Sequence, residues 1–410
     1  MMTKFHRAAP FCAVLGAVAG AAADDTSAAS APGVEVTVDD GLRIAAPDEA
    51  FSIEIGGRLH VDWARHGGET PGAEAIDGTN VRRARLELGG SFDRDWRWAA
   101  EADFANNDVS LKDFRLGYRG LESVDLTVGH QKQPYSLAVE MSSNDIPFVE
   151  RSVDSRLILP FVDRAIGVRA DASGEHWFVA TGVFGEAADP GDGADEGWGV
   201  SARVVYAPVI RDDRVLHFGL RAARREPSAT ETLQIRDETT QFSDLHVVDT
   251  GQLLVEDADL FGPEAAVAIG QLSLFSEYNR VSLKRRSAAA LNFDSWHVAA
   301  AWALGGENRA AQYDIGSGEF KRLEAEQPFR RGRGGGTWEL TTRYASIDLN
   351  DSGFVGGKEQ TFGVGANWYA GAHVRFLLDW TRVVDTDASN AVRAAAEGLD
   401  VFTLRAQFTF

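Results

Sequence analysis

Apolar and polar residues alternate along most of this chain. The segment 399–410 shows the pattern most clearly, because every second residue from position 402 onward is apolar: Phe402, Leu404, Ala406, Phe408 and Phe410. The residues between them are mostly polar and include Arg405 and Gln407. Successive side chains of a β-strand point to opposite faces. The segment is therefore predicted to be a strand with one apolar face and one polar face.

Similar segments recur along the chain and predict sixteen strands. They span residues 51–64, 80–91, 95–105, 109–119, 122–131, 163–171, 175–185, 198–207, 213–225, 262–269, 272–282, 290–304, 335–347, 359–370, 373–384 and 399–410. An even number of antiparallel strands is typical of a barrel in a bacterial outer membrane, where one face meets lipid and the other lines a polar lumen. The strands of a soluble β-sandwich would also show this alternation. However, strand faces rich in Trp and Phe extend here over more residues than a single β-sandwich contains. We predict an all-β fold, a transmembrane antiparallel β-barrel of about sixteen strands at residues 51–410.

The connections between these strands are alternately short and long. Short links fall near residues 92–94, 119–121, 172–174, 270–271 and 371–372, and long ones at 65–79, 132–162, 186–197, 226–261 and 385–398. Outer-membrane barrels place short turns in the periplasm and long loops outside the cell. Residues 305–334 break the pattern, because a long connection stands where a periplasmic turn is expected. Either the strand count is off by one or this turn is unusually long.

The first fifty residues have the composition of an export signal and a leader. Lys4, His6 and Arg7 precede an apolar run at 8–20, and the small residues 21–23 suit a cleavage site. This run is too short for the roughly 20 residues of a spanning helix. We predict a secretory signal peptide at 1–23 and a periplasmic N-terminal leader at 24–50, with a short extended segment at 34–46.

Charge and motif content exclude several functions. The formal net charge of −20 argues against nucleic-acid binding. Cys12, the single cysteine, lies in the predicted signal peptide, so the mature chain is expected to have no disulfide and no thiolate metal site. The histidines lack the H-x-x-x-H spacing of a zinc helix, and no nucleotide-binding or G-x-S-x-G motif occurs. We therefore expect no cofactor, no metal site and no enzymatic activity.

A series of short motifs resembles one family of barrels. In chain order they are Phe51-Ser-Ile-Glu-Ile-Gly-Gly-Arg58, Val81-Arg82-Arg83, Ala102-Asp103-Phe104, Val128-Gly-His-Gln-Lys-Gln-Pro-Tyr135, Ser142-Ser143, Glu150-Arg151 and Gly363-Val-Gly-Ala-Asn-Trp-Tyr369. Their order and spacing resemble the phosphate-selective porins O and P. The resemblance implies a sixteen-stranded outer-membrane barrel that assembles as a homotrimer. It also implies an inward-folded third long loop, here 132–162, and an arginine-lined pore for anions.

The resemblance and the polar strand faces together nominate seven pore residues. Candidate pore-lining or anion-binding residues are Arg58, Arg82, Arg83, Lys112, Arg115, Arg151 and Arg236. Alternation puts Arg82 and Arg83 on opposite faces unless the strand bulges there. The alternative for each arginine is a structural role, in which it pairs with a lumen carboxylate and holds the wall together.

The predicted function is passive diffusion of small anions, phosphate or polyphosphate-like, across the bacterial outer membrane. Arginine suits such a pore, because its fork of donors matches phosphate oxygens and stays charged. Two departures from the family pattern argue against selectivity for phosphate. The stretch 137–140 has no base before Ser142, and Arg236 stands alone where the family has a run of arginines.

Three alternatives follow from these departures. One is a weakly selective general porin for small hydrophilic solutes, and the others are a structural or an enzymatic outer-membrane barrel that does not conduct. The expected partners are small anions, outer-membrane lipid and lipopolysaccharide, and further copies of the chain in a homotrimer.

An apolar outer wall predicts the behaviour of the purified protein. We expect it to remain in solution only with detergent, and quenchers dissolved in lipid to reduce the fluorescence of its tryptophans. A compact particle that stays dissolved without detergent, with unquenched tryptophans, would contradict the barrel.

Overall fold

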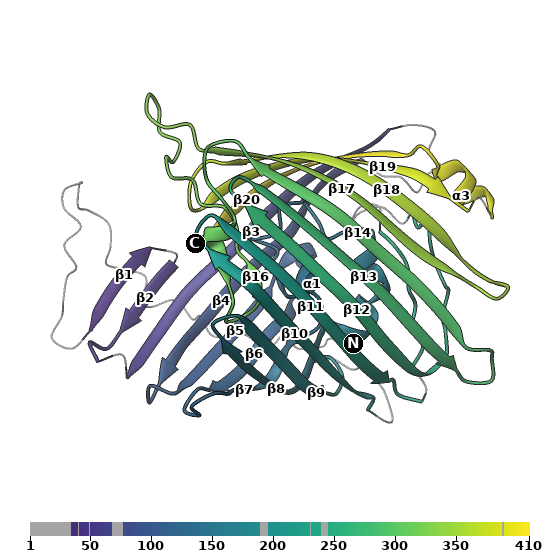
Figure 1. The fold of residues 1–410 in the computed structure, drawn as a ribbon, viewed down its shortest axis with the longest axis horizontal. Coiled ribbons are helices and arrows are strands. Elements are labelled where there is room, and N and C mark those ends of the chain that lie inside the picture. The colour runs from purple at the N-terminus through teal and green to yellow at the C-terminus, as the bar shows by residue number, and fades with distance from the viewer. Residues whose placement is uncertain are drawn as a thin grey trace, which may run out of the picture.

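Sixteen antiparallel strands form a closed wall in the computed structural model (Figure 1). The structure describes residues 34–39, 41–48, 50–67, 77–188, 196–229, 231–238, 245–387 and 389–410. The wall strands are β3 (Phe51–Gly67), β4 (Gly78–Phe92), β5 (Trp96–Asp103), β6 (Ser110–Tyr118), β7 (Asp125–Lys132), β8 (Arg164–Gly174), β9 (Trp177–Phe184), β10 (Trp198–Arg211), β11 (Arg214–Glu226), β12 (Val255–Ile269), β13 (Leu272–Arg285), β14 (Leu291–Ala303), β17 (Thr337–Asp351), β18 (Phe354–Tyr369), β19 (Val374–Thr386) and β20 (Asp400–Thr409). Pairing of β20 with β3 closes the barrel. All sixteen predicted strands are confirmed.

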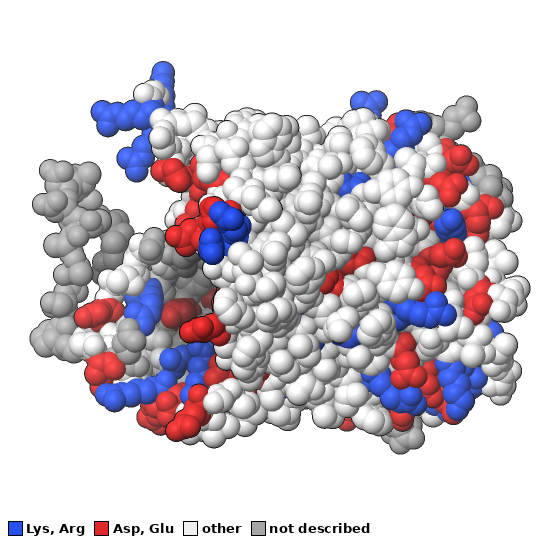
Figure 2. All heavy atoms as spheres, in the orientation of Figure 1, with Lys and Arg blue, Asp and Glu red and all other residues white. Residues whose placement is uncertain are grey.

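The outer face of the wall is apolar over most of its height. Side chains such as Phe218, Phe261 and Val168 are about half exposed, at 50%, 51% and 52%. Figure 2 shows a broad uncharged area in the middle of the wall, with charged groups gathered toward its two ends. This distribution matches an apolar band between two polar rims. No helix in the described part of the chain is long and apolar enough to cross a membrane.

Most of the long connections lie at one end of the barrel, called here the long-loop end, which also holds the short β13–β14 and β17–β18 links. The opposite end, where most connections are short, is called the short-turn end. The short-turn end also holds the 304–336 connection between β14 and β17, so the strand count is right and this turn is long. Part of it folds into the lumen as η4 (Ala310–Gln312), β15 (Tyr313–Asp314) and β16 (Glu319–Phe320). Phe320 is fully buried there, edge-on to Phe275 of the wall with ring centroids 5.5 Å apart.

A hairpin precedes the barrel at the short-turn end. It consists of β1 (Glu35–Asp39) and β2 (Gly41–Ala45), and β2 pairs with Ser52–Ile55 at the start of β3. Gly41 has a φ of +112° and lies so close to β3 that a Cβ would approach the Ile55 carbonyl oxygen to 2.5 Å. In Figure 1 the hairpin lies at the left, away from α3 (Ala391–Ala396) at the right. The predicted signal peptide lies outside the described residues.

The connection between β7 and β8 folds into the lumen, as the family resemblance implies. It contains α1 (Leu137–Glu140), η3 (Val153–Leu157) and α2 (Leu159–Val162), whereas η2 (Ala105–Asn107) lies between β5 and β6. We call residues 133–163 the inward loop. Its apolar side chains pack against inward-facing apolar residues of the wall and against the 227–254 connection. This buried cluster includes Leu157, Ile158, Phe161, Ile235, Val248, Leu253, Leu260, Leu283, Phe293 and Ile347.

This cluster corrects the expectation of a lumen lined only by polar residues. The inner faces of β12, β13, β14 and β17 carry large apolar side chains near the long-loop end. Strand alternation predicts which residues share a face, but it does not reveal that a loop will cover that face. One side of the lumen is therefore a dry protein core, and only the other side is open to water.

The dry core predicts a difference between two leucines of the wall. Leu260 faces inward and is 2% exposed, whereas Leu220 faces outward and is 56% exposed. We expect Leu260→Ala to lower the free energy of unfolding by about 2–5 kcal/mol, because it leaves a cavity in a packed core. Leu220→Ala should cost less, since lipid can fill the vacated space. Urea unfolding in lipid vesicles would compare them, and equal losses would argue against the dry core.

Candidate functional site

A β-bulge in β4 brings two neighbouring arginines to the same side of the wall. Arg83 pairs with His60 and Val81 pairs with Val61, which leaves Arg82 without a partner on β3. The extra residue lets both side chains reach the lumen. Each donates to the carboxylate of Glu150 in the inward loop, Arg82 Nε to Oε1 at 2.9 Å and Arg83 Nη1 to Oε1 at 2.9 Å. The shared face that the resemblance required is therefore present.

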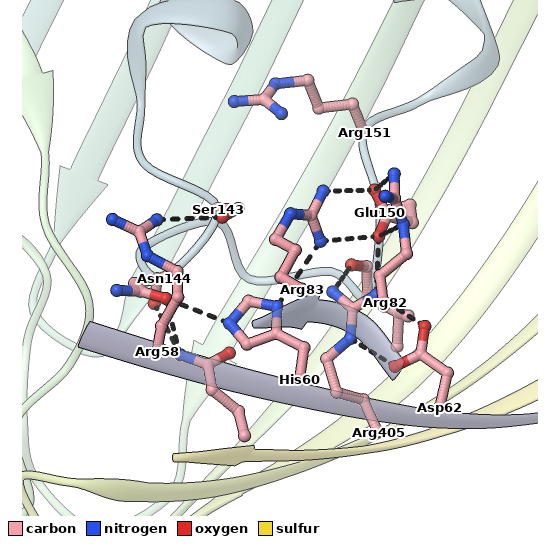
Figure 3. A network of polar contacts seen from close by, with 12 residues as sticks. Arg58, His60, Asp62, Arg82, Arg83, Ser143, Asn144, Glu150, Arg151 and Arg405 are labelled. Atoms are coloured by element: carbon pink, nitrogen blue, oxygen red, sulfur yellow. Dashed lines mark hydrogen bonds and ion pairs between the residues drawn. The ribbon is translucent and has the colours of Figure 1, made fainter. Parts of the chain in front are cut away.

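Glu150 is the centre of a cluster of positive charges (Figure 3). Arg405 of β20 donates to Glu150 Oε1 at 2.6 Å and also to both carboxylate oxygens of Asp62, each at 2.7 Å. Burial alone would raise the pKa of Glu150, but the guanidinium groups of Arg83, Arg405 and Arg82 hold it well below its usual range. The cluster fastens the inward loop to β3, β4 and β20. Sequence analysis placed Arg405 on the polar face but not in this cluster.

Arg58 contacts both the wall and the inward loop. Its Nε donates to Glu87 Oε1 at 2.7 Å, and its Nη1 donates to the hydroxyl groups of Ser142 and Ser143, each at 3.1 Å. The side chain also lies 3.7 Å from Glu101. Arg58 thus combines charge pairing within the wall with a loop contact, and it lines a cavity described below.

Three further contacts hold the inward loop on the opposite side of the barrel. Glu264 accepts from the backbone N–H of Leu137 at 3.0 Å, and Glu277 accepts from that of Ala138 at 2.7 Å. Both carboxylates are balanced by Arg221, at 2.7 and 2.9 Å. The third contact joins Asp154 in the loop to His297 of β14, with Asp154 Oδ2 2.9 Å from Nδ1. A loop tied to the wall at separate places is a fixed obstruction in the lumen.

The open side of the lumen contains two cavities. The long-loop cavity has a volume of about 130 Å³ and is lined by parts of the inward loop, the 227–254 connection and β18 to β20. The short-turn cavity has a volume of about 570 Å³ and lies against β3 to β9. Arg151 lines both. Its guanidinium group donates to the carbonyl oxygens of Ala138, Val139 and Met141 at 2.6, 3.1 and 2.8 Å, and in Figure 3 it points away from Glu150.

Basic residues outnumber acidic residues around the short-turn cavity. The basic ones are Arg58, Arg83, Arg85, Arg97, Arg115, Arg119, Lys132, Arg151, Arg164, Arg169 and Lys321. The acidic ones are Glu87, Glu101, Asp113, Asp125, Glu140, Asp171 and Glu319. Each of these carboxylates has a basic partner within 4 Å. Within the described residues, four of the basic groups have no carboxylate that close: Arg97, Arg115, Lys132 and Arg151.

The remaining candidate residues occupy different surroundings. Arg115 on β6 lines the short-turn cavity, whereas Lys112 on the same strand is not among its lining residues. Arg236 is exposed between the buried residues Ile235 and Asp237, so its side chain points away from the protein core beside the long-loop cavity. The seven candidates therefore do not form one cluster. The described residues contain no group of three or more acidic, histidine or cysteine side chains arranged to hold a metal.

Sequence comparisons identify related proteins. A family model described as phosphate-selective porin O and P matches residues 53–410. Porin O of Pseudomonas aeruginosa is 27% identical over 409 residues, which cover 90% of this chain and 91% of that protein. An uncharacterized protein of Caulobacter vibrioides is 26% identical and covers 90% of this chain and 76% of its own length.

Solved structures share the fold at lower sequence identity. An anion-selective porin from Comamonas acidovorans superposes with a TM-score of 0.56 at 14% identity, covering 88% of this chain and all of that chain. OmpT of Vibrio cholerae in its trimer form gives a TM-score of 0.53 at 12% identity, with coverage of 88% and 100%.

The Glu150 cluster predicts a loss of stability in acid. Because the pKa of Glu150 in the folded protein lies below its unfolded value of about 4.5, its contribution is full above that pH and is lost as the pH falls toward the folded value. We expect Glu150→Gln to cost about 2–3 kcal/mol at pH 7. This is less than the roughly 3–5 kcal/mol of a fully buried pair, because the Glu150 side chain keeps 31% exposure.

Unfolding midpoints between pH 7 and pH 3 would test this prediction, with Glu238→Gln as the control. Glu238 pairs with Arg156 at 3.0 Å. The wild type should lose its advantage over Glu150→Gln as the pH falls below about 4.5. A constant difference between the two proteins would count against the cluster.

Proposed function

Because the chain belongs to the family of phosphate-selective porins O and P, we propose that it passes small anions through a pore formed by the short-turn cavity and the long-loop cavity. It is a porin of the bacterial outer membrane. In this proposal the anions diffuse passively, and Arg151, which lines both cavities, stands at the passage between them. The long-loop end is extracellular and the short-turn end is periplasmic, as in other barrels of this membrane.

The charge balance of the short-turn cavity carries the proposal. A carboxylate that already has a basic partner attracts a passing cation only weakly, whereas an arginine without such a partner keeps its attraction for an anion. In this cavity each carboxylate is paired, while Arg97, Arg115, Lys132 and Arg151 lack a carboxylate within 4 Å among the described residues. The local field therefore favours anions, although the chain as a whole is acidic.

The arrangement favours weak rather than tight anion binding. The four basic groups come from β5, β6, β7 and the inward loop, so they are distributed along the path. Several moderate sites support conduction, because a tightly held ion does not leave. The long-loop cavity also contains Asp237, Glu359 and Asp379, none of which has an ion pair within 4 Å among the described residues. Such an entrance disfavours ions of high negative charge, so small anions such as phosphate fit better than polyphosphate.

Arg58, Arg82 and Arg83 take part in the proposed pore mainly by positioning the inward loop. Their guanidinium groups are paired with Glu87 or Glu150. Arg115 and Arg151 are the residues we assign to the anion path. Lys112 and Arg236 have no proposed role in selectivity, since neither lines the two cavities.

A homotrimer is part of the proposal. The strands β5, β6, β7 and β9 have only eight or nine residues, so the wall is low there. The outer face of this low wall exposes Val109, Phe114 and Val128, at 65%, 63% and 49%. Contact with neighbouring copies would cover these side chains as well as lipid does.

A channel also accounts for the paired cavities better than an outer-membrane enzyme does.

Bilayer recordings of two variants test the anion path. We expect Arg151→Ala and Arg115→Ala each to lower the anion-to-cation permeability ratio by about twofold to fivefold, as expected for one unit charge acting over about 8 Å in a hydrated pore. Reversal potentials in a KCl gradient measure the ratio. Arg214→Ala is the matched control, because Arg214 lies in an exposed turn and pairs with Asp213.

The same recordings separate the alternatives. Block of chloride current by phosphate at millimolar concentration would support phosphate among the permeant anions. If the wild type conducts but neither variant changes the permeability ratio, the protein would be a weakly selective general porin. If the wild type does not conduct, the channel proposal would be wrong.

A further inference from the structure

Two buried carboxylic acids line the long-loop cavity. Asp237 comes from the 227–254 connection and Glu359 comes from β18, and each is only 2% exposed. Both line the same cavity, on the extracellular side of Arg151. Neither belongs to the Glu150 cluster or to the basic path of the short-turn cavity. They are therefore a separate feature of the entrance.

Among the described residues, no cation balances either side chain. Asp237 Oδ1 accepts a hydrogen bond from the backbone N–H of Val248 at 2.9 Å, while Oε2 of Glu359 is buried without any hydrogen-bond partner. Within the described residues, neither carboxylate has a basic group within 4 Å. An unpaired carboxylate is costly to bury as an ion, and two together are more so.

The same cavity is lined by Asp379, which has no ion pair within 4 Å among the described residues and accepts from the backbone N–H of Val149 at 2.8 Å. It is also lined by Arg343, whose Nη1 donates to the backbone carbonyl oxygen of Glu150 at 3.0 Å. Two other basic groups near the pair already have partners. Arg156 of the inward loop pairs with Glu238 at 3.0 Å. Arg393 of α3 donates to the carbonyl oxygens of Val247 and Gly356, and it lies 3.8 Å from Asp387.

The groups that act on Asp237 itself are few. His246 donates through its ring to the backbone carbonyl oxygen of Asp237, not to the carboxylate. Burial raises the pKa of Asp237 to about 6, although the backbone N–H of Val248 and the charges of His246 and Arg156 lower it.

We propose that Asp237 and Glu359 are a proton-binding pair that sets the charge of the pore entrance: in mildly acidic surroundings the pair is neutral and admits anions, and at higher pH it is negative and disfavours them. Two buried carboxylates that line one cavity, with no cation within 4 Å among the described residues, avoid uncompensated charge and mutual repulsion by retaining protons. Among the described residues, no three acidic, histidine or cysteine side chains are arranged to hold a metal, so a proton fits the site better than a divalent cation. The pH effect on anion flow rests on the proposed function, but the proton site itself does not.

The pair also links pH to the stability of the entrance. The pKa of Asp237 in the folded protein, about 6, exceeds the unfolded value of about 3.9. The folded protein therefore holds more protons between these values, and its stability falls as the pH rises from about 4 to about 6. Above that window the loss is constant. The 227–254 connection is expected to sit most firmly on β18 in acid.

Reversal potentials at extracellular pH 5.0 and 7.5 test the proposal. In the wild type we expect the anion-to-cation permeability ratio to be about twofold to fivefold higher at pH 5.0, the range for one charge at about 8 Å in a hydrated pore. Asp237→Asn and Glu359→Gln should each remove at least half of this change, since one member of the pair no longer titrates. An unchanged pH dependence in both variants would overturn the proposal.

Glu238→Gln is the matched control at the same entrance. It removes one negative charge from an ion-paired neighbour of Asp237. We expect it to raise the permeability ratio at both pH values and to leave the pH dependence in place. If Glu238→Gln abolished the pH dependence as completely as Asp237→Asn, the effect would belong to total charge and not to the pair.

Infrared titration of the folded protein in detergent gives a readout that does not depend on conduction. The band of protonated carboxyl groups should lose intensity between pH 5 and 7.5 in the wild type, and this loss should be smaller in Asp237→Asn and in Glu359→Gln. If the infrared titration behaves as expected but the recordings show no anion preference, the proposed function would be wrong and the proton site would still be supported. If the wild type and the two variants gave identical titration curves, the proposed proton site would be wrong. Reproduction of the acid effect by millimolar Ca²⁺ at pH 7.5, abolished in Asp237→Asn, would replace the proton with a metal.

Discussion

The ionic contact between Glu150 and three arginines of the wall controls how the lumen is divided. Arg82, Arg83 and Arg405 come from β4 and β20, and they meet one carboxylate of the inward loop. Such a cluster is favourable only while both signs of charge are present, since each partner alone would be a buried, uncompensated ion. The cluster therefore holds the loop at one height in the barrel. The rest of the passage takes its shape from that position.

The fixed loop divides the lumen into a dry side and a wet side. Toward β12, β13, β14 and β17 its apolar residues complete a packed core. Toward β3 to β9 it leaves a cavity with an excess of basic groups. The apolar side chains of the loop thus stabilise the fold by packing against the wall, while its Arg151 lines the cavities on the other side. Narrowing of the pore and anchoring of the loop are two consequences of one arrangement.

Charge is distributed in a way that the net charge of the chain conceals. The protein carries a formal charge of −20, yet the carboxylates around the short-turn cavity are neutralised by neighbouring basic groups. The guanidinium group of Arg151, which is held by backbone carbonyl oxygens, keeps its charge available. At the long-loop cavity the situation reverses, because the lining residues Asp237 and Glu359 have no cation within 4 Å among the described residues. In the proposed passage, an ion meets these carboxylates before it reaches the cavity with an excess of basic groups.

Alternation along the chain determined the sixteen strands, their lipid-facing sides and the outer-membrane class, because strand geometry and lipid contact act on neighbouring residues. The sequence did not determine whether the side chains of Arg82 and Arg83 point to the same face of the wall. Only the β-bulge between β3 and β4 decided that they do. Tertiary structure alone decided which arginines are paired, since the partner of Arg83 lies 67 positions away in a loop. It alone left Arg236 outside the lining of the two cavities and placed Asp237 and Glu359 in the lining of one of them. Contacts between distant segments depend on how a loop packs inside the barrel, and that packing leaves no periodic trace in the sequence.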